Sequence, residues 1–390
     1  MQVMTENKVV TKLRFGEFQD GWKSILLSEV STITTGTTPS TSKKEYYDGK
    51  RLFVSPADIK DNRFVVTTKT TLTELGFKKG RKLAKGSVLF VCIGSTIGKI
   101  AQVYEECMSN QQINALTANS NNSNDFIFSL LSLKAKKIKR LAGVQAVPQL
   151  NKTDFSKLKF YFPSLPEQQK IASFLSAVDK KLQQLTKKKE LLEEYKKGVM
   201  QKIFSQELRF KDANGNNYPH WEDKKLGKIC SVIKGKQLNK SELTETGLYP
   251  ALNGGINASG YTDKWNTEKD VITISEGGNS CGYVNLSKTR FWCGGHCYSL
   301  LKLQSNINFE YLFQMLKFSE THIMRLRVGS GLPNIQMKEI NKFSIKLPEI
   351  DEQQKIANFL SAIDDKISLV STQIENTKAF KKGLLQQMFV

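Results

Sequence analysis

The chain has 390 residues, of which 39% are hydrophobic, and this length exceeds what one ordinary core organises, so we expect at least two domains. Its 58 lysine and arginine residues outnumber 37 acidic residues, and the net charge of +21 indicates a polyanionic partner: nucleic acid, an anionic membrane or a very acidic protein. The N-terminus lacks the apolar segment of a secretory signal, and no run reaches the ~18 apolar residues of a membrane span. With six sparse, unevenly spaced cysteines that read as reduced thiols, these features predict a cytoplasmic protein without a membrane anchor.

Taken in chain order, the predicted elements alternate between mixed regions and long helices. Buried or alternating apolar runs predict strands at 88–93, 159–162, 271–275, 298–303 and 343–346. Apolar periodicity predicts helices at 125–141 and 308–327, which occupy matching places in the two halves of the chain. Clusters of Gly, Ser, Thr and Asn predict loops at 34–42, 119–124, 254–260 and 276–282.

The most informative feature is an internal repeat. Residues 167–179 read EQQKIASFLSAVD and residues 352–364 read EQQKIANFLSAID, at an offset of 185. The same offset relates YKKGVMQKIF at 195–204 to FKKGLLQQMF at 380–389. Weaker anchors open each half: Trp22 and Trp221 are followed by the same apolar spacing, and the segments between the anchors differ almost completely. A duplicated scaffold with two different inserts indicates one mechanical task performed on two different targets.

Both repeated blocks are predicted to be long helices. Pro166 suits a first helical turn, and apolar residues then recur at alternating steps of four and three, which is a heptad pattern. The seam is interrupted at Lys189, Thr377 and Lys381. Pairing of the two helices with each other is the simplest way to cover both seams. The residues predicted to pair are Ile171, Leu175, Val178, Leu182 and Leu185 in the first helix and Ile356, Leu360, Ile363, Ile367 and Val370 in the second.

These patterns predict an α+β chain with a pseudo-two-fold internal repeat. Two globular domains of mixed α/β structure are joined by two long helices that form a coiled coil. The predicted divisions are an N-terminal arm (1–21), a first domain (22–162), a central helix (163–205), a linker (206–220), a second domain (221–347) and a C-terminal helix (348–390).

Motifs for catalysis are missing or incomplete. Residues 94–99, GSTIGK, are one residue short of a phosphate loop, and Ile100 stands where a magnesium-binding Ser or Thr belongs, so we interpret them as a turn after a buried strand. Cys293 and Cys297 flank His296, but zinc needs about four ligands and only Cys281 is near in sequence, so we predict no metal site. We also find no methyltransferase, helicase or nucleophilic-triad motif, and we predict no catalytic and no cofactor-binding residue in this chain.

Lysine-rich segments are the remaining candidates for a binding surface. Those between 187 and 197 alternate with glutamates, which favours a solvated helix face. Basic residues in loops are better candidates for DNA phosphate contacts. These predicted DNA-binding residues are Lys43, Lys44, Lys78, Lys79, Arg81, Lys82, Lys234, Lys236, Arg325 and Arg327.

The tandem pattern resembles the specificity subunits of type I restriction-modification enzymes. The resemblance covers essentially the whole chain and rests on the two EQQKI motifs after Pro163 and Pro348, the terminal YKKG and FKKG elements, and the two tryptophan openings. It implies that each domain is a target-recognition domain for one half of a bipartite, asymmetric site in double-stranded DNA. It implies that the two helices pair antiparallel as a spacer. It also implies two methyltransferase subunits and further restriction subunits as partners, with S-adenosylmethionine, ATP and magnesium bound by those partners.

Two other functions fit the residues. A specificity subunit of a Type II-like fused nuclease-methyltransferase system would share this architecture. A non-enzymatic coiled-coil scaffold protein would explain the helices and leave the charge incidental.

Overall fold

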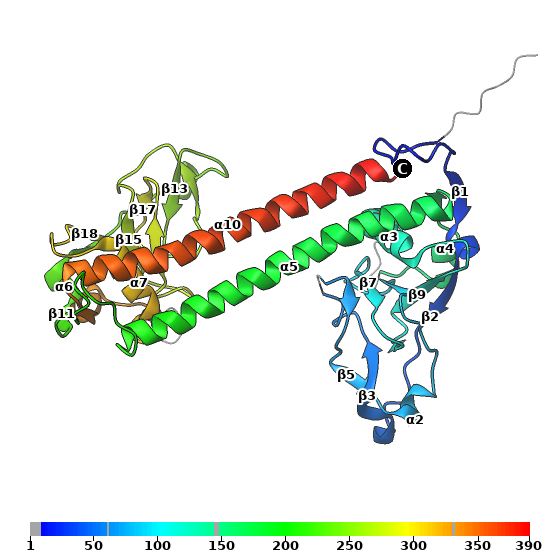
Figure 1. Ribbon diagram of the computed structural model, residues 1–390, viewed down its shortest axis with the longest axis horizontal. Helices are drawn as coiled ribbons and strands as arrows, with labels where there is room; N and C mark the ends of the chain where they lie inside the picture. Colours follow the sequence, from blue (N-terminus) through cyan, green and yellow to red (C-terminus); the bar gives the residue numbers. More distant parts are fainter. Residues whose placement is uncertain (1–8, 61, 144–147, 330, 332) are drawn as a thin grey trace, which may run out of the picture. The chain divides into compact units, whose positions relative to one another are not determined.

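The structure is a computed structural model that describes residues 9–60, 62–143, 148–329, 331 and 333–390. Residues 1–8, part of the predicted N-terminal arm, lie outside the described residues. The chain divides into two compact units: unit 1 is Met1–Leu185 with Gln373–Val390, and unit 2 is Thr186–Thr372. Each unit therefore combines a mixed α/β domain with a segment of each of two long helices, α5 (Leu165–Phe204) and α10 (Ile350–Met388), which Figure 1 shows in green and orange-red.

Unit 1 is built on a five-stranded sheet in the order β2-β9-β6-β7-β4, a three-stranded sheet in the order β5-β3-β8 and the pair β1-β10. β4 and β7 are parallel, as are β3 and β8, and the other pairs are antiparallel. The strands are β1 (Lys23–Leu26), β2 (Ser31–Thr35), β3 (Tyr47–Val54), β4 (Phe64–Val65), β5 (Thr70–Leu72), β6 (Val88–Val91), β7 (Ile100–Val103), β8 (Met108–Ser109), β9 (Ile113–Ala118) and β10 (Lys159–Phe162). The helices are α1 (Leu27–Val30), η1 (Lys44–Tyr46), α2 (Glu74–Phe77), α3 (Asn124–Arg140) and α4 (Lys152–Ser156).

Unit 2 repeats this plan with a four-stranded sheet in the order β12-β18-β15-β16, a three-stranded sheet in the order β14-β13-β17 and the pair β11-β19. The strands are β11 (Glu222–Lys225), β12 (Ser231–Lys234), β13 (Tyr249–Leu252), β14 (Gly260–Thr262), β15 (Val271–Ser275), β16 (Val284–Ser287), β17 (Trp292–Cys293), β18 (Cys297–Leu301) and β19 (Ser344–Leu347). The helices are α6 (Leu226–Ile229), η2 (Lys240–Glu242), α7 (Phe309–Phe318), α8 (Glu320–Met324) and α9 (Met337–Lys342). The predicted fold class is confirmed, and the five predicted strands lie within two residues of the observed ones.

One predicted element is wrong. The helix expected at 308–327 is two helices, α7 and α8, separated at Ser319. Just after the break, the carboxylate of Glu320 accepts a hydrogen bond of 2.9 Å from the backbone N–H of Val284 in β16. Apolar periodicity could not reveal this break, because the bond joins residues far apart in the sequence.

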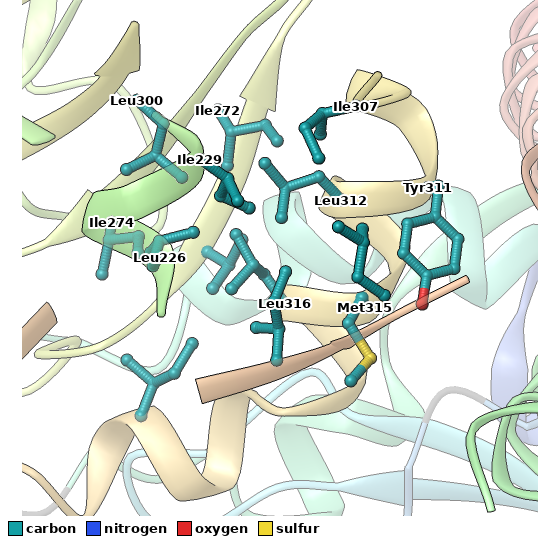
Figure 2. Packing of buried hydrophobic residues seen from close by; sticks show 14 of the residues in the cluster. Leu226, Ile229, Ile272, Ile274, Leu300, Ile307, Tyr311, Leu312, Met315 and Leu316 are labelled. Carbon is teal, nitrogen blue, oxygen red and sulfur yellow. The ribbon is translucent and has the colours of Figure 1, made fainter. Parts of the chain in front are cut away.

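The core of unit 2 forms where α7 covers its four-stranded sheet. Figure 2 shows Leu312, Met315 and Leu316 of α7 packed against Ile272 and Ile274 of β15 and their neighbours. Asn308 caps α7 by accepting from the N–H of Tyr311, just as Ser123 caps α3 by accepting from Phe126. Equivalent caps therefore start the helix that covers the sheet in each half.

The repeated Glu-Gln pair anchors each domain to its long helix. In unit 1, buried Glu167 accepts from Arg14 at 2.7 Å and from the Trp22 indole at 3.3 Å, while Gln168 accepts from the backbone N–H of Ser123 at 3.0 Å. The same bonds recur in unit 2, where Glu352 binds Arg209 and Trp221, and Gln353 accepts from the N–H of Asn308. The repeat thus encodes one joint, made twice.

The two long helices pair antiparallel. In unit 1, Asp179 of α5 binds Lys381 of α10 at 2.5 Å, and in unit 2, Lys196 of α5 binds Asp364 of α10 at 2.7 Å. As the residue number rises along α5, the number of its partner falls along α10, so the chain directions oppose. The two ion pairs also correspond to each other under the internal repeat.

The residues predicted to pair are mostly buried. Ile171, Leu175 and Val178 lie in the core of unit 1, and Ile356, Leu360 and Ile363 lie in the core of unit 2. Leu182, Leu185 and Ile367 are half-buried and Val370 is buried. Among the described residues, no helix combines the length and apolar character needed to cross a membrane.

Candidate nucleic-acid interface

Two basic clusters predicted from separate parts of the sequence lie on one lobe of unit 1. The hydroxyl of Thr73, the N-cap of α2, donates to the carbonyl of Glu45 in η1 at 2.7 Å, and its N–H donates to Tyr46. Gly76 permits this contact, because a Cβ there would collide with the Tyr46 carbonyl. We call η1, α2 and their flanks the basic lobe. Its exposed predicted DNA-binding residues are Lys43, Lys44, Lys78, Lys79, Arg81 and Lys82.

Arg81 connects the basic lobe to the last residue of β2. Its guanidinium donates to the carbonyl of Thr35 at 2.8 Å. Beside it, the ammonium of Lys82 lies 5.3 Å from the centre of the buried Phe77 ring. The Thr35 carbonyl and the Phe77 ring therefore contact the charged ends of two side chains that are otherwise exposed to solvent.

In unit 2, Lys234 and Lys236 lie at the end of β12, in the position that Thr35 and Thr37 hold in unit 1. Lys234 binds the buried carboxylate of Glu276 at 2.6 Å, and the Tyr298 hydroxyl donates to the same oxygen at 2.9 Å. Burial raises the pKa of Glu276, but the bonds from Lys234 and Tyr298 and the charge of Lys234 outweigh it, so the pKa lies below its ordinary 4.5. The carboxylate thus stays ionised and holds Lys234.

Arg325 and Arg327 follow α8 and are exposed. Val328, the next residue, exchanges backbone hydrogen bonds with Asn334, which also bridges to Gly277, so Arg327 lies near the turn at 276–282. Unit 2 therefore gathers Lys234 and Arg327 around one turn, while Arg325 lies at the C-terminal end of α8.

The glycine-rich segments after β6 and β15 are turns, as predicted. Gly94 and Gly98 have φ of 94° and 92°, and Gly278 and Gly282 have φ of 76° and 86°, in the region that favours glycine. The ammonium of Lys99 donates to the carbonyls of Pro56 and Ile59 at 3.2 and 3.0 Å. This lysine therefore supports the fold of unit 1.

The cysteines of unit 2 lie against backbone carbonyls. The Cys281 thiol donates to Glu276 at 3.0 Å, and the Cys293 thiol donates to the carbonyl of Cys297 at 3.6 Å. Within the described ranges, the structure gathers no group of three or more metal-binding side chains.

The lysines of α5 form ion pairs along their own helix, Lys187 with Glu190 and Lys189 with Glu193.

Sequence reasoning missed the polar residues that join the elements. Glu167, Glu352, Asp179 and Asp364 hold the domains and helices together, and none was selected as a candidate. The sequence did contain a signal for them. Glu167 is repeated as Glu352 and Asp179 as Asp364, at the offset of 185, while most of the chain outside the repeated blocks differs between the halves.

Comparison with known proteins agrees with this architecture. The family model for the type I restriction modification DNA specificity domain matches residues 19–194 and again residues 219–378. The chain belongs to this family. Its two matches coincide with the two halves that the internal repeat defines, so each half is one copy of the type I specificity domain.

Individual relatives of the type I specificity family are similar over one half or over the whole chain. A putative type I specificity subunit from Mycoplasma genitalium is 31% identical over 176 residues, 45% of this chain and 46% of that protein, so this match spans about half of the relative's length. The Type I restriction enzyme MjaIX specificity subunit of Methanocaldococcus jannaschii is 22% identical and aligns over 96% of this chain and 94% of that one. The crystal structure of an M. genitalium S subunit has a TM-score of 0.71 at 19% identity, covering 98% of this chain and 99% of that one, and supports the fold.

Proposed function

We propose that this chain is the sequence-specific DNA recognition subunit of a type I restriction-modification complex. The proposal rests on one observation: the same joint between a domain and a long helix occurs in both halves, and the two domains have different surfaces. Glu167 and Glu352 make the same bonds, yet unit 1 presents the basic lobe and unit 2 presents Lys234, Lys236 and Arg327. Two different surfaces on one repeated scaffold suit the two unrelated halves of a bipartite, asymmetric site.

The same proposal covers partners and chemistry. We assign the chain no catalytic role: methylation and cleavage belong to two methyltransferase subunits and to restriction subunits that assemble on the scaffold. S-adenosylmethionine, ATP and magnesium are assigned to those partners, and the complex to the cytoplasm, where it meets DNA. A solved structure from work on complex assembly in the type I system has a TM-score of 0.56 to this chain at 18% identity, which supports a shared fold.

Exchange of one domain tests the proposal. Replacing residues 22–157 with the corresponding block of a relative should change one half of the methylated sequence and leave the other half unchanged. Long-read methylation mapping in cells that also carry the partner methyltransferase measures this directly. A change in both half-sites would contradict two independent domains. Unchanged methylation would favour the coiled-coil scaffold, and copurification of one fused nuclease-methyltransferase would favour the Type II-like system.

A further inference from the structure

The two halves share a set of loops with the same backbone hydrogen bonds. We call it the loop frame: residues 35–37, 92–98, 109–113 and 148–150 in unit 1, and residues 234–236, 276–282, 293–297 and 333–335 in unit 2. It brings together the end of one strand, two turns and the segment that leads to α4 in unit 1 or α9 in unit 2. Its backbone is equivalent in the two halves although the side chains are almost all different.

Five pairs of equivalent bonds define the loop frame, with lengths of 2.8 to 3.0 Å. In unit 1 the donors and acceptors are Gly36 to Ile113, Thr37 to Ser109, Cys92 to Gln112, Gly94 to Pro148 and Leu150 to Cys92. In unit 2 they are Gly235 to Cys297, Lys236 to Cys293, Glu276 to His296, Gly278 to Pro333 and Ile335 to Glu276. Gly36 and Gly235 are required by close approach, because a Cβ on either would collide with backbone carbonyls of the facing turn.

The side chains on this backbone differ in chemistry. Gln111 of unit 1 corresponds to Gly295, and Thr37 corresponds to Lys236. Because the two halves share this backbone but not its side chains, we infer that the backbone has the same role in both halves and that the side chains have different roles. For two domains on one scaffold, the difference is the target.

Gln111 in unit 1 and Lys236 in unit 2 are long, exposed polar side chains of the loop frame. Gln111 is exposed, and its carbonyl oxygen accepts from the Thr38 hydroxyl at 2.6 Å, which orients its amide. Lys236 is exposed, and its backbone is held on both sides, by its N–H to Cys293 and by the Trp292 indole that donates to its carbonyl at 2.7 Å. Both side chains therefore extend from rigid positions.

Positive charge lies directly beside the loop frame in both halves. Arg81 of the basic lobe donates to Thr35, which is part of the frame. In unit 2, Lys234 is itself in the frame, and Arg327 is followed by Val328, which bridges to Asn334 of the frame. Cations that bind phosphates would place the frame next to the base edges, since phosphate contacts position a protein and base contacts specify the sequence.

We propose that the loop frame reads bases, with Gln111 contacting an adenine in one half-site and Lys236 contacting a guanine in the other. The inference rests on the proposed function, because it assumes a bipartite DNA target. A glutamine amide matches the N6 and N7 groups of adenine, and a lysine ammonium donates to O6 and N7 of guanine. Unit 1 would use a residue of the segment 109–113, and unit 2 would use a residue of the segment 234–236. This explains why the two halves share the backbone of the frame and differ in its side chains.

The test uses the full chain assembled with its methyltransferase subunits and a pool of DNA duplexes of random sequence. Selected duplexes are sequenced for the wild-type protein and for variants. Gln111→Ala should reduce the preference for adenine at one base pair about tenfold and leave the other half-site unchanged. Gln111→Glu should move that preference toward cytosine, because a carboxylate accepts from the cytosine amino group. Lys236→Ala should reduce a guanine preference, also about tenfold, in the opposite half-site.

Matched controls separate base contacts from other roles. Lys152→Ala, an exposed lysine of α4 outside the loop frame, should leave all base preferences unchanged. The inference is overturned if Gln111→Ala and Gln111→Glu select the wild-type sequence, or if Lys236→Ala weakens all sequences equally with a smaller salt dependence, as a phosphate contact would. A wild-type complex that selects no sequence would refute the proposed function itself, before any variant is compared.

Discussion

At the scale of single residues, the chain is held together by buried carboxylates that each serve two donors. Glu352 is 0% exposed and binds both the Arg209 guanidinium and the Trp221 indole. A buried charge is tolerated only when it is paired, so removing one partner leaves the other uncompensated. Glu276 in unit 2 has the same character, with Lys234 and Tyr298 as its donors.

Replacing Glu352 with glutamine should therefore destabilise unit 2. Glutamine keeps the shape of the side chain and can still accept from Trp221, but Arg209 loses its counter-charge. We expect a loss of about 2 kcal/mol, as is typical of hydrogen bonds to charged groups. Denaturant unfolding measures the change, and Glu349→Gln, an exposed glutamate just before α10, is the control. Equal stability of the two variants would contradict the role of this joint.

The lowered pKa of Glu276 predicts a dependence on pH. A carboxyl group whose pKa is lower in the folded state contributes stability above its unfolded value of about 4.5, and this stability is lost as pH falls through the folded pKa. Lowering the pH from about 7 to well below 4.5 should thus destabilise the wild type more than Glu276→Gln, which has no proton to gain. Thermal unfolding across this range gives the comparison. Parallel curves for the two proteins would show that Glu276 contributes nothing to the acid sensitivity.

At the scale of elements, the ion pairs Asp179–Lys381 and Lys196–Asp364 specify how α5 and α10 align. Apolar seams allow slippage by a heptad, whereas opposite charges at defined positions favour one alignment. The amide of Gln314 in α7 also donates to Asp364 at 2.7 Å. The helix that covers the sheet of unit 2 therefore contacts the same ion pair.

Reversing one charge of the second ion pair should destabilise the helix pair, and reversing both should restore it. Asp364→Lys places like charges together, and we expect a loss of about 1 kcal/mol because Asp364 is 41% exposed. Adding Lys196→Asp re-forms the pair with exchanged signs. The comparison of single and double variants by denaturant unfolding isolates the interaction. A double variant that is no more stable than the single one would exclude this pair as a determinant of alignment.

The basic lobe predicts how binding of DNA depends on salt. Each phosphate that a lysine or arginine neutralises releases counterions, so affinity falls as salt rises. Changing Lys78, Lys79, Arg81 and Lys82 together to alanine should reduce the salt slope by about one unit for each true phosphate contact. Binding titrations at several salt concentrations measure the slope. An unchanged slope would remove these four residues from the DNA contact surface.

At the scale of the whole molecule, the repeat extends to the N-terminal arm and to the end of α10. In unit 1 the N–H of Leu13 donates to the carbonyl of Gln387 at 2.9 Å, and in unit 2 the N–H of Leu208 donates to the equivalent Lys202 at 2.9 Å. Phe389 packs against Trp22 and Phe126 just as Phe204 packs against Trp221 and Tyr311. The arm thus binds α10 in the way that the linker after α5 binds its own helix.

This equivalence predicts that the chain tolerates circular permutation. The permuted protein is made by joining residue 390 to residue 1 and opening the chain between Gln206 and Glu207. The N-terminal arm is then covalently linked to α10, and the linker is no longer covalently linked to α5. We expect the permuted protein to fold and to recognise the same DNA sequence, which methylation mapping with the partner subunits would show. Opening the chain within β15 instead breaks a buried strand and serves as the control. Failure of the first permutation alone would show that the two joints differ.

The sequence by itself determined the duplication, the two long helices and five of the strands, among them the buried β6, β15 and β18. These features are written along the chain, in the repeat of EQQKI, in heptad spacing and in continuous apolar runs such as Val88–Val91, so local physics suffices to find them. Only the tertiary structure showed that Lys43 and Lys78 share one lobe, that residues 308–327 form two helices, and that the loop frame recurs with different side chains. The reason is that hydrogen bonds between distant loops depend on backbone geometry, which nearly unrelated sequences can share.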